Sequence, residues 1–273
     1  MDINKLDYSD YVEIADGIYW VGFADRKAGL HCNPYLVVED DEAVLIDSGS
    51  RNDFSTVMLK ILRTGTNLKN IARLIYHHYD PDLCGNIPHM EEMIGSDDLK
   101  ILSHYENHIF INYYSPHSPK ECIEEMGFVY EFKSRRRLEF IRIPYAHSPG
   151  SFVTYDTKTK TLFSSDLFGS YDVNWDLYAD IFDQCGSCDP VPVCPLTDKP
   201  CHVVSVWDFH KRVMPSTKSL KNAINRVEAL DIMLIAPQHG RIFRTPASAK
   251  IIIEKVKELK SAGIDSMLGE DGE

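Results

Sequence analysis

The sequence predicts an α/β protein in which helices cover the outer faces of packed sheets. Two observations lead to this prediction. Short β-prone segments alternate with amphipathic helical segments along the chain, and His or Asp residues follow several of the predicted strands. Because no low-complexity linker interrupts the alternation, we expect a single domain over residues 1–273, with a core from about 8 to 265 and an acidic tail at 269–273.

The chain begins with three short apolar segments that are typical of adjacent strands. They cover Ile18–Gly22, Tyr35–Val38 and Ala43–Ile46. Asn52 or Asp53 can cap the helix that comes next, and Gly65 ends it. A buried strand at Ile71–His77 then leads into a loop rich in His and Asp.

The middle of the chain repeats this alternation. We expect helices at His104–Tyr114 and Glu121–Met126. The strands expected after them are Phe128–Phe132, Leu138–Ile143, Phe152–Tyr155 and Thr161–Ser164.

The last third begins with a long loop at Tyr171–His202 and continues with two helices. Ser216 is placed to cap the second of these helices. A strand at Ile232–Ala236 comes next. The final helix has a Thr245 cap followed by proline at its first position, a typical helix start.

Charge and hydropathy exclude several classes of function. The 273 residues include 29 Lys and Arg against 41 Asp and Glu, which gives a formal net charge of −12. A nucleic-acid binder needs a basic face, so we expect no such partner. No apolar run reaches the roughly 18–20 residues that span a bilayer, and the acidic N-terminus lacks a secretion signal. We expect a cytoplasmic protein without a membrane partner.

Common catalytic motifs are missing as well. The sequence contains no G-x-G-x-x-G turn for a dinucleotide, no Gly-Lys-Ser or Gly-Lys-Thr for a phosphate loop, and no G-x-S-x-G elbow. These absences disfavour a nucleotide-binding protein and a serine hydrolase.

A dense group of His and Asp comes after the buried strand near residue 77. His78, Asp80 and Asp82 alternate along the chain, so an extended loop can direct all three into one cavity. Open α/β sheets bind ligands at the carboxyl ends of their strands. A second interpretation stays open, in which Asp82 only caps the next helix.

His147, Asp166 and His239 also come directly after predicted strands. A single such histidine is usually an ordinary hydrogen-bonded residue, but four strand ends that each supply imidazole or carboxylate indicate a shared ligand. Together with the earlier group they suffice for two metal ions if one carboxylate bridges. Three carboxylates and three imidazoles without thiolate suit iron or manganese better than structural zinc.

These motifs resemble the metallo-β-lactamase superfamily, whose fold is an αββα sandwich. In chain order they are His78-Tyr79-Asp80-Pro81-Asp82, His147-Ser148-Pro149-Gly150, Ser164-Ser165-Asp166 and Ala236-Pro237-Gln238-His239-Gly240. Within the superfamily, Asp80-Pro81-Asp82 and Asn33-Pro34-Tyr35-Leu36 are similar to the flavodiiron proteins and their oxygen-binding relatives.

The resemblance implies two iron ions that change between Fe2+ and Fe3+ and carry an oxo or peroxo bridge. The implied ligands are His78, Asp80 and His147 for one iron, Asp82 and His239 for the other, and Asp166 as the bridge. Asp47, in Leu45-Ile46-Asp47, would support the site without touching metal.

Two departures from the superfamily pattern separate its branches. Hydrolases of the superfamily have a histidine at the position of Asp80 and another at the position of Leu83. Flavodiiron proteins have a glutamate at the position of Asp80 and do not need a histidine ligand at the position of Leu83. A dizinc hydrolase is therefore the alternative to the di-iron protein.

The resemblance also implies a ligand and partners. Flavodiiron proteins receive electrons from FMN on a fused flavodoxin-like domain, and we expect no such domain here. We therefore expect an O2 sensor or carrier, or an O2 or NO reductase of the oxidoreductase type that depends on an external electron donor. A signalling partner and a homodimer are further expectations from the resemblance.

Several polar residues remain. His31 and Cys84 are placed by the motifs to line the pocket. His31 could equally be an ordinary loop histidine, and for Cys84 a small buried residue is favoured over a reactive thiol. The loop at 185–202 holds four further cysteines in a C-x2-C-x5-C-x6-C pattern, namely Cys185, Cys188, Cys194 and Cys201. They could bind an additional metal, or they could be ordinary thiols, because the pattern lacks a second C-x2-C pair.

Overall fold

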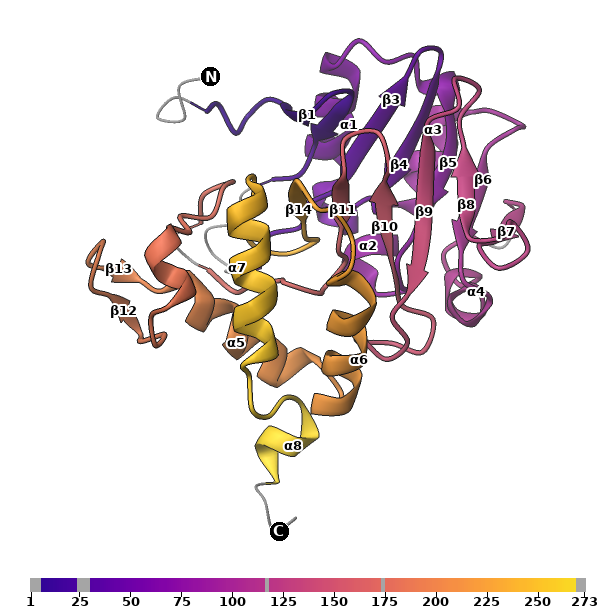
Figure 1. Cartoon of the computed structure of the whole chain (residues 1–273). Helices are drawn as coiled ribbons and strands as arrows, with labels where there is room; N and C mark the ends of the chain where they lie inside the picture. The colour runs from indigo at the N-terminus through magenta and orange to yellow at the C-terminus, as the bar shows by residue number, and fades with distance from the viewer. Residues whose placement is uncertain (1–5, 24–29, 116–117, 173–174, 269–273) are drawn as a thin grey trace. The chain divides into compact units, whose positions relative to one another are not determined.

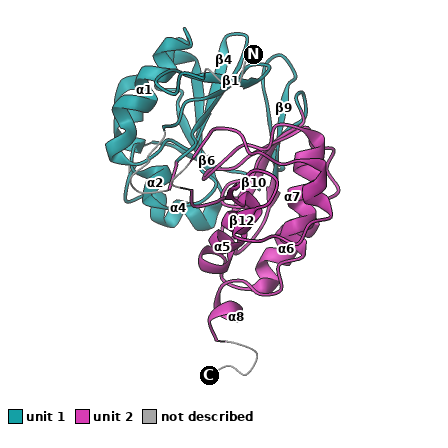
Figure 2. Ribbon diagram, turned by 90° about the vertical axis from the view of Figure 1, so that its left-hand side faces the viewer, with its two compact units in different colours: residues 1–24, 32–140, 156–159 teal, residues 25–31, 141–155, 160–273 magenta. Residues whose placement is uncertain are grey.

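The computed structural model describes residues 6–23, 30–115, 118–172 and 175–268 (Figure 1). The predicted acidic tail at 269–273 lies outside these residues. The chain divides into two compact units (Figure 2). Unit 1 comprises residues 1–24, 32–140 and 156–159, and unit 2 comprises residues 25–31, 141–155 and 160–273. The expectation of one domain over 1–273 stays a prediction.

Unit 1 contains a seven-stranded sheet in the order β1-β2-β3-β4-β5-β6-β7. Its strands are β1 (Val12–Ala15), β2 (Ile18–Trp20), β3 (Tyr35–Glu39), β4 (Glu42–Ile46), β5 (Ile71–Ile75), β6 (Lys100–Ser103) and β7 (Lys120–Cys122). The pairs from β1 to β4 are antiparallel and those from β4 to β7 are parallel. The carboxyl ends of β4, β5 and β6 therefore lie along one edge of the sheet.

The helices of unit 1 pack their apolar faces onto this sheet. They are η2 (Arg51–Asp53), α1 (Phe54–Arg63), η3 (Leu68–Asn70), α2 (Pro81–Cys84), α3 (Ile87–Ile94) and α4 (Tyr105–Ile111). Val57 and Ile61 of α1 lie in the same buried cluster as Leu45 of β4 and Leu74 of β5. Apolar residues three and four apart on a helix thus bury one stripe, as the sequence pattern predicts.

The prediction of a helix at Glu121–Met126 is wrong. Residues 120–122 form β7, which pairs in parallel with β6. The Glu121 carboxylate lies 2.6 Å from Arg73 Nε on β5 and 2.7 Å from Lys100 Nζ on β6. Burial alone would raise the pKa of Glu121, but these hydrogen bonds outweigh it and lower that pKa. Contacts to residues distant in sequence therefore override the local helical pattern.

Unit 1 also contains the hairpin of β8 (Val129–Glu131) and the first residues of β9 (Arg137–Arg142). Beside it, Arg136 Nε and Nη2 donate to the two carboxylate oxygens of Asp156, both at 2.9 Å, and Nη1 lies 3.0 Å from Glu39. The side chains of Arg136 and Asp156 are 1% and 0% exposed. This bidentate pair joins the short segment 156–159 to the rest of unit 1.

Unit 2 contains three neighbouring strands of a five-stranded sheet and three longer helices. In this sheet, β11 (Thr161–Phe163) lies between β10 (Phe152–Asp156) and β14 (Leu234–Ala236), and β11 and β14 are parallel. The helices are α5 (His202–Val213), α6 (Thr217–Val227), α7 (Pro246–Lys257) and the short α8 (Ile264–Met267). Their apolar stripes share one buried cluster with the strands.

The helix starts predicted in unit 2 are confirmed. Ser216 accepts a hydrogen bond from the backbone of Ser219 at 3.2 Å, and Thr245 accepts one from Ser248 at 3.1 Å. Pro246 occupies the first position of α7. Among the residues that the structure describes, no helix combines the length and apolar character needed to cross a bilayer.

The long loop predicted at Tyr171–His202 contains short regular elements. These are η4 (Asp183–Gly186) and a two-stranded antiparallel sheet of β12 (Val193–Cys194) and β13 (Lys199–Pro200). All four cysteines of the C-x2-C-x5-C-x6-C pattern lie in or beside these elements, and all four are free.

Candidate metal centre

Unit 1 presents three of the predicted ligands after β5: His78 and Asp80 lie in the turn between β5 and α2, and Asp82 lies in the first turn of α2. Asp80 occupies the residue before α2, with Pro81 at the first helical position, and its side chain makes no capping hydrogen bond. His78 Nε2 lies 3.8 Å from Asp80 Oδ2, and the His78 side chain is almost fully buried. The carboxylate of Asp80 is thus directed towards the imidazole rather than used as a helix cap.

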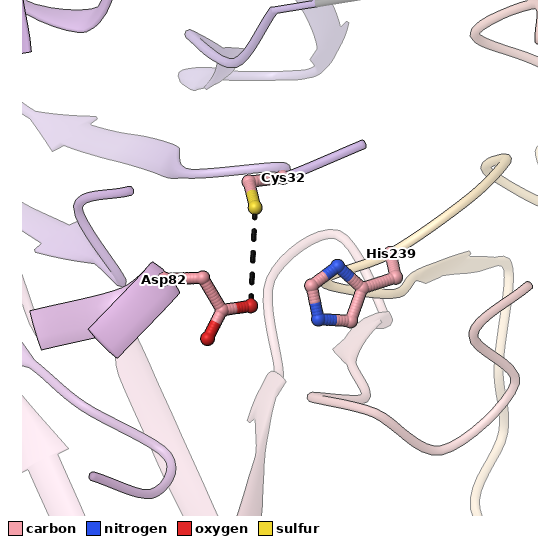
Figure 3. Close-up of side chains that lie close together, drawn as sticks. All are labelled: Cys32, Asp82 and His239. Atoms are coloured by element: carbon pink, nitrogen blue, oxygen red, sulfur yellow. Dashed lines mark hydrogen bonds between the residues drawn. The ribbon is translucent and has the colours of Figure 1, made fainter. Parts of the chain in front are cut away.

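Asp82 contacts a residue that the sequence reasoning missed. The Sγ atom of Cys32 lies 3.9 Å from Asp82 Oδ2, in the arrangement of a weak S–H donor and a carboxylate acceptor (Figure 3). Cys32 is 5% exposed. Its neighbour Asn33 accepts a hydrogen bond from Trp20 Nε1 at 2.8 Å, which fixes the backbone here. The available signal was the position of Cys32 directly before Asn33-Pro34-Tyr35-Leu36.

Asp47 supports this turn through the residue before His78. Its Oδ2 lies 3.0 Å from His77 Nδ1, and its Oδ1 accepts from the His77 backbone amide at 3.3 Å. Asp47 has a positive φ of 54°, a conformation that aspartate adopts more readily than most residues. Asp47 therefore fixes the chain where it enters the ligand turn.

Cys84 holds the same turn from within the core. It is fully buried, and its thiol lies 3.6 Å from the carbonyl oxygen of His78. Burial raises the pKa of the Cys84 thiol well above its ordinary value. A neutral, buried thiol has little nucleophilic reactivity, so its role in the pocket stays a prediction.

Unit 2 brings the other three predicted ligands together. Asp166 comes after β11 and His239 after β14, so the parallel pairing of these strands brings both residues to the same edge. His147 Nε2 lies 2.9 Å from Asp166 Oδ2, and His239 Nε2 lies 3.5 Å from Asp166 Oδ1. Each oxygen of this buried carboxylate therefore faces a different imidazole.

A backbone contact fixes the orientation of His239. Its Nδ1 lies 3.0 Å from the carbonyl oxygen of His31. A carbonyl only accepts, so Nδ1 carries the proton and Nε2 presents its lone pair on the Asp166 side. The imidazole of His31 instead bonds the Asp172 carbonyl at 2.7 Å and stacks on Trp175. His31 thus contacts the predicted ligand His239 through its backbone carbonyl and not through its side chain.

Two features hold the turns that carry Asp166 and His239. Gly240 has a φ of 81°, and a Cβ atom there would lie 2.1 Å from Ser170 Oγ. His210 Nε2 accepts from the amide of Phe168 at 3.1 Å while its Nδ1 bonds the Val206 carbonyl at 2.7 Å. Burial lowers the pKa of His210 to about 4, so its ring stays neutral and keeps the acceptor nitrogen. Sequence reasoning also missed His210.

The family assignment comes from comparison with known proteins. Residues 30–240 match a family model described as ODP family beta lactamase. The chain belongs to the ODP family. The matched residues include every predicted ligand of both units, and the α/β fold expected from the sequence is therefore the beta-lactamase-like fold of this family.

Curated relatives of this ODP-family chain include longer proteins. An uncharacterized protein of Methanocaldococcus jannaschii is 27% identical over 90% of the chain and 60% of its own length. A nitric oxide reductase of Moorella thermoacetica is 26% identical over 86% of the chain and 58% of its length. A putative diflavin flavoprotein of Synechocystis is 25% identical over 81% of the chain and 35% of its length. The chain thus spans about 35–60% of these relatives.

Solved structures share the fold of the ODP-family chain. The apo state of the chemotaxis sensor ODP from T. denticola superposes with a TM-score of 0.74 at 23% identity, over 94% of this chain and 96% of that one. A structure described as the peroxy diiron species of chemotaxis sensor ODP gives 0.73 at 24%, over 94% and 98%. The flavodiiron protein from Giardia intestinalis gives 0.74 at 19%, over 92% and 59%.

The donor atoms of this ODP-family chain fit iron. The two groups of ligands offer carboxylate oxygens and imidazole nitrogens, the donors that non-haem iron prefers. The strongest geometric evidence is Asp166, whose two oxygens face separate imidazoles, as a carboxylate that bridges two ions requires. A tetrahedral structural zinc site would instead favour thiolates.

Proposed function

We propose that this ODP-family chain binds O2 at a non-haem di-iron centre. His78, Asp80 and His147 hold one iron, Asp82 and His239 hold the other, and Asp166 bridges them. The observation that carries this proposal is the pair of contacts from the Asp166 oxygens to His147 and His239.

The chain's own residues prepare this centre. The carbonyl of His31 holds His239 in the tautomer whose Nε2 can bind metal. Asp47 and Cys84 fix the backbone on both sides of His78. The thiol of Cys32 lies against Asp82, where it can supply a hydrogen bond to a carboxylate oxygen that metal leaves exposed.

Two ferrous ions, when bound, supply electrons to O2 or NO. A sensor and a reductase both bind O2 or NO first, and they differ only in what happens after this ligand has bound. The likeness to a chemotaxis sensor supports O2 sensing, and the likeness to nitric oxide reductases supports reduction with an external donor. We place O2 binding first because it precedes both outcomes. A cytoplasmic homodimer with a redox or signalling partner completes the proposal.

The dizinc hydrolase is the second candidate, and Leu83 disfavours it. Leu83 is fully buried in the apolar core of unit 1. It occupies the position at which the hydrolase branch of the superfamily has a metal-binding histidine, and leucine offers no donor atom.

Anaerobic purification, metal analysis and then exposure to O2 test the proposal. We expect about two irons per chain and new visible absorption after O2 is added. Asp166→Asn should lose both signals, because an amide is a poor bridge between two cations. Asp208→Asn is the matched control, since Asp208 is an exposed aspartate that pairs with Lys211 on the same helix.

Two results would contradict the di-iron proposal. One is a protein that contains no iron and shows no spectral response to O2. The other is a protein that contains zinc and hydrolyses a thioester, lactone or phosphodiester through metal-activated water. The second result would support the hydrolase.

A further inference from the structure

The cysteines of the long loop in unit 2 form two groups that differ in how firmly they are held. Cys185 and Cys188 lie in and just after η4, whereas Cys194 and Cys201 lie at the β12–β13 hairpin. None of them belongs to the predicted di-iron ligands.

The first group is anchored to α7. A Cβ atom at Gly186 of η4 would lie 3.7 Å from Ile251 Cγ1, so this turn packs directly on the helix. Lys255 Nζ donates to the carbonyl of Cys188 at 2.9 Å. The Cys188 thiol lies 3.4 Å from the Cys185 carbonyl, which closes the C-x2-C turn. This turn is anchored to α7 and carries two of the four thiols.

The second group lies on a hairpin that has almost no apolar support. The β12–β13 sheet has only two residues per strand, and Figure 1 shows it set apart from α7. Val193 and Leu196 are both 56% exposed. An isolated two-stranded hairpin is marginally stable in water, and small lobes without a core usually depend on disulfides or a metal ion. The β12–β13 hairpin therefore needs a disulfide or a bound metal ion to stabilise it.

The turn of this hairpin already favours a thiolate. Hydrogen bonds from the backbone amide of Leu196 and from Thr197 hold the pKa of the Cys194 thiol below its ordinary value. The amides of Thr197 and Asp198 also bond the Cys194 carbonyl, at 3.2 and 2.9 Å. Amide donors directed at a sulfur stabilise its negative charge, as thiolate metal ligands require.

Three of the four cysteines line one cavity of about 340 Å³ in unit 2, and Cys188 lies outside its lining. Cys185, Cys194 and Cys201 line it, together with His202 and the cation of Lys199. His202 is 7% exposed, and neither of its ring nitrogens has a hydrogen-bond partner among the residues that the structure describes. A buried imidazole without partners costs free energy unless an acceptor meets its N–H. The cavity thus combines thiols with an unpartnered donor.

We propose that Cys185, Cys188, Cys194 and Cys201 bind one zinc ion as a tetrathiolate, with the His202 N–H donating to a ligand sulfur. Each thiol loses its proton to solvent on binding. The cation of Lys199 offsets part of the negative charge of the complex, and so does that of Lys255, which also pairs with Glu258 at 3.0 Å. Within the described part of the chain, no three of these sulfurs lie within 4.8 Å of one another. Zinc binding would therefore draw the hairpin towards the anchored C-x2-C turn.

Metal analysis with X-ray absorption at the zinc edge tests this proposal on the full chain. We expect about one zinc per chain with four sulfur neighbours at about 2.3 Å. The double variant Cys185→Ser/Cys194→Ser should lose the zinc and keep its iron. Cys122→Ser is the matched control, because Cys122 is a buried cysteine of β7 in unit 1.

A second measurement keeps the test decisive if the double variant fails to fold. Amide hydrogen exchange of residues 189–200 in the wild-type protein should speed up at least tenfold when a zinc chelator is added, while α7 keeps its protection. Zinc-free protein with four reactive thiols would overturn the proposal, as would disulfides between these cysteines or iron bound by sulfur. Because zinc and iron are counted separately, this outcome is independent of the di-iron proposal.

Discussion

At the scale of single residues, the candidate site depends on contacts that hold the ligands as much as on the ligands. The carbonyl of His31 determines which nitrogen of His239 can bind metal. Cys32 and His210 act on Asp82 and on the turn after Asp166. Partners of this kind commonly change metal affinity ten- to a hundredfold when they are removed.

Cys32→Ala should weaken iron binding about tenfold, because Asp82 loses the thiol that lies against its carboxylate. Cys32→Ser should retain most of the affinity, since a hydroxyl also donates. Iron titration monitored by the visible spectrum measures both variants. Equal affinities for the alanine variant and the wild type would show that the thiol has no part in holding Asp82.

His210→Phe should destabilise the protein by about 1–3 kcal/mol, because the buried amide of Phe168 loses its acceptor. The same variant should bind iron more weakly, since the turn that carries Asp166 is released. His210→Gln keeps an acceptor oxygen and should restore part of both. Urea denaturation and iron titration are the measurements, and a phenylalanine variant as stable as the wild type would contradict the role given to His210.

At the scale of elements, unit 1 places a lysine where an apolar residue is usual. Lys60 of α1 is fully buried, donates to the carbonyl of Gly22 at 2.5 Å and lies over the ring of Trp20. Burial lowers the pKa of this ammonium to about 8. In the unfolded chain the same group has an ordinary pKa near 10.5.

This difference in pKa makes the stability depend on pH. Between about pH 8 and 10.5 the unfolded state binds more protons than the folded state, so the free energy of unfolding rises with pH. From pH 7.5 to 10 the contribution of Lys60 is about 2 kcal/mol. Lys60→Met should lack this gain, so its stability relative to wild type should fall by that amount over the same range in urea denaturation. A constant difference between the two proteins would exclude a depressed pKa.

The elements also show which local patterns decide structure. The caps at Ser216 and Thr245 are local, and α6 and α7 begin where the sequence predicts. Residues 121–126 look helical in isolation, but Glu121 meets Arg73 and Lys100 from two other strands and becomes part of β7. Arg73 and Lys100 lie too far from Glu121 in the sequence for a local sequence pattern to include them.

The same distinction applies to the candidate site. The predicted ligands come directly after strands, so the sequence alone leads to the expectation that they lie at one edge of a sheet. Cys32 and His210 carry no such pattern, because their roles depend on where Asp82 and Phe168 lie in the folded chain. Local sequence therefore predicts donors of metal bonds better than it predicts the groups that orient them.

At the scale of the whole molecule, each unit contributes three of the proposed ligands. His78, Asp80 and Asp82 belong to unit 1, and His147, Asp166 and His239 belong to unit 2. Because each unit supplies three of the proposed ligands, iron binding should stabilise the turns that carry them.

Iron should raise the stability of the anaerobic protein by about 3 kcal/mol when free iron exceeds its dissociation constant a hundredfold. The stabilisation should grow with iron concentration and should be absent in Asp166→Asn. Chemical denaturation at several iron concentrations measures it, with Asp208→Asn as the control. Stability that does not change with iron in the wild type would mean that the folded protein does not bind the metal selectively.

The buried pair of Arg136 and Asp156 has a consequence for biosynthesis. Unit 1 is assembled from segments that leave the ribosome at different times, and Asp156 lies twenty residues after Arg136. Until Asp156 has emerged, the guanidinium has Glu39 as an ion-pair partner but lacks both hydrogen bonds to Asp156, and removing one partner from a buried charge pair costs several kcal/mol. Co-translational folding of unit 1 should therefore stall at this point, and a transcript truncated between the two codons should yield a polypeptide that chaperones retain.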